Sequence, residues 1–180
     1  MPYEVLNSKT TYNGVIVNVT VDTLTLPDGS TTKRETVIRG NASAILPIDN
    51  NGNIILVKQY RHAAKRLTLE IPAGMLDDGE DPLLCAAREM EEEIGYKSDN
   101  ITLLFSTYPA LGFCTEIIHI YKAEDLYAGK QNFDSDEFIE IIKMPLTKAV
   151  ELIHNGEIVD GKSICAIMAY AVQKATNYEK

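Results

Sequence analysis

The sequence lacks the features that mark membrane and secreted proteins. Its 180 residues contain no run of about 18 or more apolar residues, so no segment is long enough to span a bilayer as a helix. The first residues do not show the basic-then-apolar pattern of a secretory signal. Only three cysteines occur, Cys85, Cys114 and Cys165, without metal-site spacing and amid apolar neighbours, which predicts buried thiols in a reducing compartment. We therefore expect a cytoplasmic protein with no membrane partner.

Clustered positive charge is also missing. The chain carries 26 acidic and 17 basic residues, and its formal net charge is −9. No stripe of lysine and arginine is present, which argues against nucleic acid as a partner. The negative charge would also repel a small diphosphate. A site for such a ligand would need bound divalent cations, which reverse the local sign of the charge.

The chain does contain enough apolar residues, 45%, for the core of one ordinary domain, or of one domain with a small appendage. Residues 15–38 have the pattern of extended hairpins, with a turn at Pro27-Asp28-Gly29. Such hairpins are too small to bury a core of their own, so they must pack on the rest of the chain or on a second copy. We therefore divide the sequence into an N-terminal β-hairpin or sheet region, residues 1–41, and a mixed α/β domain, residues 42–180.

The second region alternates expected strands and helices. Strands are expected at residues 44–48, 54–60, 67–72, 101–108, 116–123 and 138–144. Two helices are expected near its end, at residues 147–154 and 162–175. No internal repeat or low-complexity segment interrupts this order.

The segment from Gly74 to Tyr96 holds the most specific pattern, G-M-L-D-D-G-E-D-P-L-L-C-A-A-R-E-M-E-E-E-I-G-Y. Asp81 and Pro82 are typical of a helix start, as an N-cap acceptor followed by a proline whose missing N–H is not needed there. Gly95 is typical of the left-handed position that ends a helix. An apolar stripe for the core is expected at Leu83, Ala87, Met90 and Ile94.

Three glutamates share one side of this expected helix. At roughly 100° per residue, Glu89, Glu92 and Glu93 fall on an arc beside the apolar stripe. Carboxylates so close would repel one another unless cations lay between them. Mg²⁺ or Mn²⁺ suits such oxygen ligands, particularly where a phosphate supplies more of them. The alternative interpretation is that these glutamates form a solvated helix face. The flanking glycines and Arg88, at these fixed spacings, argue against that interpretation.

The segment resembles the signature of the Nudix hydrolases, G-x5-E-x7-R-E-U-x-E-E-x-G-U with U aliphatic. Gly74, Glu80, Arg88, Glu89 and the remaining specified positions fit, and Tyr96 alone departs from the pattern. The resemblance implies an α/β fold, the Nudix α/β/α sandwich with a mixed sheet, preceded here by the small N-terminal antiparallel sheet. It also implies that Arg88 orients a metal-binding glutamate.

Flanking segments resemble the subgroup of ADP-ribose pyrophosphatases and related nucleoside diphosphate sugar hydrolases. They are Arg34-Glu35, Gln59-Tyr60-Arg61, Glu70-Ile71-Pro72-Ala73-Gly74, Tyr108-Pro109-Ala110-Leu111-Gly112-Phe113 with Glu116, and Gly156-Glu157-Ile158-Val159-Asp160. This subgroup implies metal-dependent hydrolysis of a nucleotide sugar, ADP-ribose to AMP and ribose 5-phosphate. It also implies a homodimer that exchanges its N-terminal sheets.

The resemblance assigns roles to individual residues. Metal ligands are implied at Glu89, Glu93 and the backbone carbonyl of Ala73, with Glu92 as a further ligand through water, and Glu92 and Glu93 thereby take part in catalysis. A general base is expected in the acidic loop 134–137, at Glu137, which could equally be part of a solvated turn. Substrate contacts are expected at Arg34, Arg61, Glu70, Gly112 and Glu116. The three histidines receive no role.

One departure leaves the sugar open. The subgroup has Ser-Pro where this chain has Ala110-Leu111, and losing the proline should loosen a loop near the substrate. Other Nudix substrates therefore remain as alternatives, namely GDP-mannose, a coenzyme A derivative or a dinucleoside polyphosphate. A non-catalytic nucleotide-binding module is a further alternative, although such a module would be expected to lose one of the three glutamates.

Overall fold

The computed structural model describes residues 3–132 and 138–176. The chain divides into two compact units. The smaller consists of Met1–Asn41 together with Tyr108–Ile117, and the larger of Ala42–Thr107 together with Ile118–Lys180. The smaller unit therefore combines the N-terminal region with a loop from the middle of the chain.

The larger unit is built on two main sheets. The first has the order β7-β4-β10-β9, formed by β7 (Ala73–Met75), β4 (Ala42–Pro47), β10 (Ile118–Glu124) and β9 (Asn100–Thr107). The second has the order β12-β5-β6, formed by β12 (Glu140–Pro145), β5 (Asn53–Arg61) and β6 (Arg66–Glu70). The first sheet is mixed, because β4 and β10 run parallel while the other neighbours are antiparallel. A short pair, β8 (Tyr96–Lys97) and β11 (Tyr127–Ala128), lies apart from both sheets.

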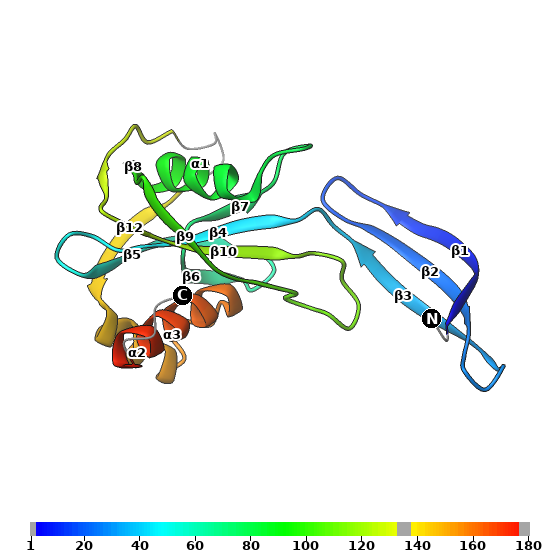
Figure 1. Cartoon of the computed structure of the whole chain (residues 1–180). Coiled ribbons are helices and arrows are strands. Elements are labelled where there is room, and N and C mark those ends of the chain that lie inside the picture. The colour runs from blue at the N-terminus through cyan, green and yellow to red at the C-terminus, as the bar shows by residue number, and fades with distance from the viewer. Residues whose placement is uncertain (1–2, 133–137, 177–180) are drawn as a thin grey trace. The chain divides into compact units, whose positions relative to one another are not determined.

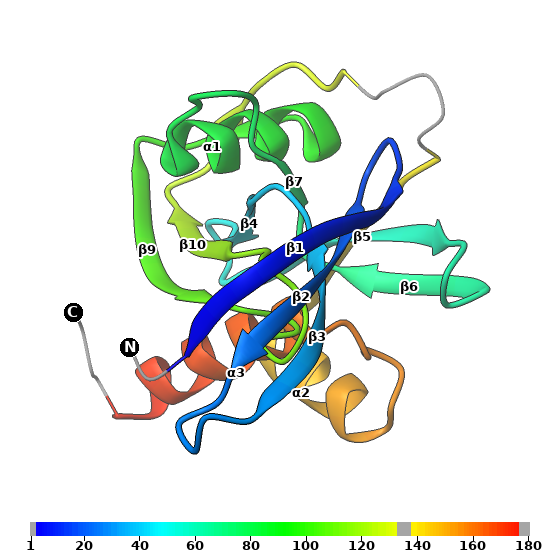
Figure 2. The same ribbon diagram turned by 90° about the vertical axis from the view of Figure 1, so that its right-hand side faces the viewer.

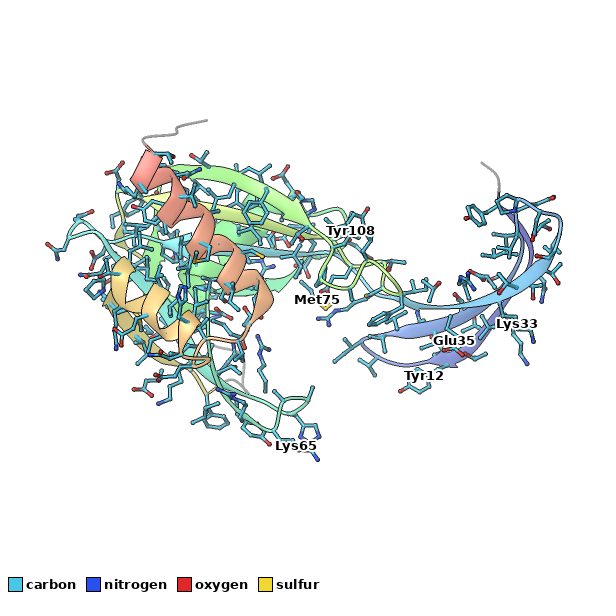
Figure 3. All side chains as sticks on the ribbon, turned by 90° about the horizontal axis from the view of Figure 1, so that it is seen from below. Tyr12, Lys33, Glu35, Lys65, Met75 and Tyr108 are labelled. Atoms are coloured by element: carbon cyan, nitrogen blue, oxygen red, sulfur yellow. The ribbon has the colours of Figure 1, made fainter. Side chains whose placement is uncertain are left out.

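Helices cover both sides of these sheets. Helix α1 (Pro82–Ile94) lies on one side, and α2 (Leu146–His154) and α3 (Gly161–Thr176) lie on the other (Figure 1). Strands β5 and β6 continue past the covered region as a long hairpin, which is clearest in Figure 2. Its tip carries Lys65 (Figure 3). The expected α/β/α sandwich with a mixed sheet is confirmed.

The core has two halves because the central strands are buried on both faces. In β4, Ala44 and Leu46 face the half that contains α2 and α3, while Ile45 faces the half beneath α1. Strand β5 alternates in the same way, as Ile54 and Ile55 illustrate. Strands covered on both faces become continuous apolar runs rather than alternating ones, which is why these two were readily recognised in the sequence.

The smaller unit holds a three-stranded antiparallel sheet without a buried residue in its strands. Its order is β1-β2-β3, formed by β1 (Glu4–Asn13), β2 (Asn18–Thr25) and β3 (Thr31–Ile38). The expected turn joins β2 to β3, where the Asp28 carboxylate accepts hydrogen bonds from the backbone and the hydroxyl of Ser30. Tyr12 and Lys33 project from this sheet (Figure 3). Strand β1 was not predicted, because its exposed residues mix polar and apolar types without alternation.

Two sequence expectations about burial need correction. Leu83 is 39% exposed, and the buried face of α1 instead includes Cys85 and Ala86. Of the three cysteines only Cys85 is buried, while Cys165 is exposed. In the described part of the chain, none of the helices has the length and apolar character to cross a membrane.

Candidate active site

The signature segment folds as a strand, a loop and a helix in the larger unit. Asp81 caps α1 by accepting a 2.8 Å hydrogen bond from the backbone N–H of Leu83, and Pro82 occupies the first turn. Gly95 ends the helix at φ 70°, and its N–H donates to the Glu91 carbonyl at 2.9 Å. These caps confirm the predicted helix boundaries and fix which side chains α1 presents to the loop.

Arg88 gathers the acidic side chains of this segment. Its Nε and Nη2 donate to the two oxygens of Glu80 at 2.9 and 3.0 Å. Its Nη1 donates to Glu89 Oε1 at 2.7 Å and to Glu92 Oε2 at 2.9 Å. The hydrogen bond from Arg88 lowers the pKa of Glu80 to about 2, with a further contribution from the backbone N–H of Asp77. One guanidinium thus holds three carboxyl groups close together, and its positive charge offsets their mutual repulsion.

Gly74 allows Glu89 to lie directly against the loop. A Cβ atom built on Gly74 would fall 1.8 Å from Glu89 Oε1 and 2.1 Å from its Cδ. No side chain fits in that space, so the first glycine of the signature is required by the close approach of a carboxylate to the backbone. Glu89 is consequently held between the loop and Arg88.

A polar pocket of about 420 Å³ opens beside these groups. It is lined by Ala73, Gly74, Met75, Asp77, Arg88, Glu89, Glu92 and Asn132. Three of the four predicted metal-ligating residues, Ala73, Glu89 and Glu92, therefore meet at one pocket. The fourth, Glu93, lies on the same helix with only 2% of its surface exposed.

The donor set fits a hard divalent cation. It consists of carboxylate and backbone carbonyl oxygens, which Mg²⁺ and Mn²⁺ prefer. In the described residues, no three Asp, Glu, His or Cys side chains form a closed metal-binding group. An ion here would take some ligands from water or from substrate phosphates, as Mg²⁺ commonly does.

Arg61 and Glu70 form a second polar centre in the larger unit. Arg61 Nε and Nη2 each donate to one oxygen of Glu70 at 2.8 Å, while Thr68 and Lys162 donate to the same carboxylate at 2.7 and 2.6 Å. Burial would raise the pKa of Glu70, but the hydrogen bonds from Arg61 and the charge of Lys162 outweigh it and lower the pKa to about 2. The Glu70 carboxylate is therefore ionised and fully engaged by protein groups.

This arrangement sets the position of Arg61. The hydrogen bonds that Arg61 donates to Glu70 raise the pKa of Arg61, and the negative charge of Glu93 adds to this effect. Arg61 therefore lies within electrostatic reach of the acidic helix. About 45% of the Arg61 side chain stays exposed. Arg61, a predicted substrate contact, thus has a guanidinium whose orientation is fixed. Glu70 was also predicted to contact the substrate, but in this structure its carboxylate binds Arg61.

The remaining predicted residues lie elsewhere in the chain. Arg34, Gly112 and Glu116 belong to the smaller unit. There, Glu116 Oε1 lies 3.2 Å from Arg39 Nε, and the Arg34 guanidinium donates to the Thr32 hydroxyl at 3.0 Å. Glu137, the predicted general base, lies outside the described residues.

Sequence reasoning missed several members of both centres. Asp77 and Asn132 line the pocket, and Lys162 and Thr68 hold Glu70. The signature gave no sign of Asn132, which follows the helix by almost forty residues and donates its backbone N–H to the Glu92 carbonyl. Lys162 pairs with a residue 92 positions away, a distance that no local pattern encodes.

The chain is similar to known proteins over most of its length. The sequence model of the NUDIX domain matches residues 38–166. The chain is 37% identical over 171 residues to an ADP-ribose pyrophosphatase of Bacillus subtilis (strain 168), covering 94% of this chain and 92% of that protein. It is 39% identical over 171 residues to a methanol dehydrogenase activator of Bacillus methanolicus, covering 93% and 92%.

Two further matches agree in extent. A GDP-mannose pyrophosphatase of Yersinia enterocolitica is 38% identical over 149 residues, covering 77% of this chain and 76% of that protein. A solved structure described as an ADP compounds hydrolase superposes with a TM-score of 0.87 at 23% identity, covering 96% of this chain and 95% of the other. With its signature helix, its sandwich fold and these relatives, the chain belongs to the Nudix family.

Proposed function

We propose that this Nudix pyrophosphohydrolase cleaves the diphosphate bond of ADP-ribose and releases AMP and ribose 5-phosphate. The observation that carries the proposal is the pocket in which Arg88 holds Glu89 and Glu92 beside the Ala73 backbone. Relatives named ADP-ribose pyrophosphatase support this substrate. They are 35% and 37% identical to this chain over alignments that cover 93% and 94% of it. GDP-mannose is the second candidate, because other relatives are named GDP-mannose pyrophosphatase.

We assign the divalent cation, Mg²⁺ or Mn²⁺, to Glu89, Glu92, Glu93 and the Ala73 carbonyl. When bound, the cation supplies positive charge that offsets the negative charge developing on the diphosphate in the transition state. The chain's own contribution is to keep these oxygens in place. Arg88 clamps Glu89 and Glu92, and Gly74 leaves room for Glu89 to approach the backbone.

Arg61 is the proposed substrate-binding cation of the larger unit. Its guanidinium can hold a phosphate bidentately or stack on adenine, and Glu70 fixes its orientation. Arg34, Gly112 and Glu116 remain proposed contacts from the smaller unit. Glu137 remains the proposed general base, which would accept the proton of the attacking water.

We further propose a homodimer in which residues 1–41 complete the partner's substrate pocket. Support comes from the smaller unit, whose sheet buries none of its strand residues. Large apolar side chains are exposed along it, among them Val5, Leu6, Tyr12 and Ile16. A three-stranded sheet without a core is unstable alone, and a second copy would cover it.

A cytoplasmic location is part of the proposal, since all three cysteines are free thiols.

A nucleotide panel tests the activity. Purified full-length chain is incubated with ADP-ribose, GDP-mannose, a coenzyme A derivative and a dinucleoside polyphosphate, each with Mg²⁺ and with Mn²⁺, and products are separated by chromatography. We expect ADP-ribose to give the highest kcat/KM and equal amounts of AMP and ribose 5-phosphate. The variant Glu89→Gln serves as the inactive control. Preference for another substrate would replace ADP-ribose in the proposal, and no hydrolysis of any substrate would refute it.

A further inference from the structure

Ser163 joins the start of α3 to the segment that leads into the pocket. Its side chain is fully buried. Its hydroxyl accepts a 2.8 Å hydrogen bond from the backbone N–H of Ile71 and donates to the Asp160 carboxylate. Asp160 also accepts from the backbone N–H of Ser163 at 3.0 Å, which caps the helix. The hydroxyl is therefore held by the helix end on one side and by the Ile71 backbone on the other.

Ile71 lies two residues before Ala73, and the short segment between them is fixed at every step. Pro72 has no N–H, and its carbonyl accepts from the Ile45 N–H at 2.9 Å. Ala73 pairs with Ala44 where β7 joins β4. Ile71 itself is fully buried between strands β6 and β7, so its N–H needs a protein acceptor, and Ser163 supplies it.

We propose that Ser163 is a positioning residue for the cation site, because it holds the Ile71 N–H and thereby sets the direction of the Ala73 carbonyl. The inference rests on the proposed function in one respect, namely that the Ala73 carbonyl is a ligand of the divalent cation. Groups that orient ligands from outside the site commonly change metal affinity when they are removed. A purely structural hydrogen bond would instead lower stability and leave the affinity of the folded protein unchanged.

The test compares Ser163→Ala with the wild type. Binding of Mn²⁺ to the substrate-free full-length chain is measured by electron paramagnetic resonance of the free ion, and hydrogen exchange is followed in peptides that cover residues 70–75. We expect Mn²⁺ to bind about tenfold more weakly, exchange at residues 70–75 to become faster, and kcat to fall more than KM rises. Wild-type Mn²⁺ affinity and wild-type exchange in Ser163→Ala would overturn the proposal.

Two further variants make the comparison specific. Ser163→Thr keeps the hydroxyl and should restore Mn²⁺ binding. Ser98→Ala is the matched control, because Ser98 also accepts from a backbone N–H, that of Asn100 at 2.8 Å, and donates to a backbone carbonyl, that of Glu124. It should leave Mn²⁺ binding unchanged. Weakening of equal size in Ser98→Ala would contradict the assignment to Ser163.

Failure to fold does not remove the test. If Ser163→Ala does not fold, Ser163→Cys replaces it, since a thiol is a weaker acceptor of similar size, and the same losses are expected. Failure of the proposed function is distinguishable. A wild-type chain that binds no Mn²⁺ and hydrolyses no nucleotide would overturn both, whereas an active wild type matched by Ser163→Ala would overturn the positioning role alone.

Discussion

The Glu89 carboxylate lies against Gly74, where any side chain on residue 74 would collide with it. In Gly74→Ala the new methyl would overlap Glu89, whose nearest oxygen lies 1.8 Å from the added Cβ. Glu89 must then move away from the loop. We expect kcat to fall roughly 100-fold, the size of loss that a displacement of about 1 Å can produce at an active site. Steady-state kinetics checks this. Gly161→Ala is the control, because an added Cβ there meets nothing within 4 Å.

Glu137 is the proposed general base of the reaction. Glu137→Gln removes the proton acceptor and keeps the size of the side chain. We expect kcat to fall about 100-fold or more, in line with general-base contributions, while Mn²⁺ still binds. Glu140→Gln provides the comparison, since Glu140 forms an exposed ion pair with Lys58. Near-normal turnover in Glu137→Gln would move the role elsewhere, with Glu93 as the next candidate.

Glu70 links stability to acid pH. Its pKa is lowered to about 2 from an ordinary value of 4.5, so the folded state binds fewer protons than the unfolded state between those values. The stabilisation is complete above about pH 4.5 and is lost as the pH falls toward 2. We expect Glu70→Gln to be less stable at pH 7 and to lose less stability between pH 5 and pH 2.

Urea unfolding at a series of pH values measures this difference. The slope of interest is the change in the free energy of unfolding with pH. Glu80, whose pKa is also lowered to about 2, contributes to this slope in both proteins, so Glu70→Gln should reduce the slope without abolishing it. Glu151→Gln, which removes an exposed partner of Lys148, should show the wild-type slope. A Glu70→Gln protein with an unchanged slope would show that the Glu70 carboxylate does not contribute to acid stability.

At the scale of elements, α1 depends on its left-handed end. Gly95 has φ 70°, and an alanine there is strained although its Cβ would meet Gln131 only at 3.4 Å, an ordinary contact. We expect Gly95→Ala to lower the free energy of unfolding by about 1 kcal/mol. Thermal unfolding compared with Gly161→Ala checks this. Equal stability of the two variants would contradict the role of the left-handed end.

The sequence predicted elements where the pattern is local. The caps of α1 and the apolar runs of β4 and β5 carry their own signals, and the structure confirms them. Strand β1 was missed because no face of it is buried, so nothing selects an alternating pattern. Leu83 was wrongly placed in the core, since helical periodicity gives the spacing of a face but not which side the sheet covers.

For the site, too, the sequence predicted contacts within one helix but not contacts between distant segments. Glu89, Glu92 and Arg88 share one helix, so their meeting follows from its geometry. The contacts of Lys162 and Ser163 with residues 70 and 71 join segments 92 positions apart. Such contacts depend on how α3 packs against the sheets, which single-sequence patterns do not specify.

For the whole molecule, the uncovered sheet of the smaller unit makes association testable. We expect the wild type to sediment as a dimer at micromolar concentration. A double variant, Val5→Asp with Leu6→Asp, places charges on exposed apolar positions of β1 and should sediment as a monomer. Val172→Asp, an exposed apolar position on α3, should remain a dimer. A monomeric wild type would refute the proposed association.

The loop Tyr108–Ile117 has a consequence for how the chain can be cut or recombined. It belongs with the N-terminal sheet, and Val37 exchanges backbone hydrogen bonds with Phe113 and Thr115 at 2.7 and 3.0 Å. The polypeptide therefore passes between the two units three times. Cleavage at a single peptide bond therefore cannot release the whole smaller unit, because the loop 108–117 would stay attached to the larger one. A fragment that starts at residue 42 would contain this loop without the strand β3 that it pairs with. A chimaera that takes residues 1–41 from a relative would therefore also need the matching loop 108–117 to keep the pairing with Val37.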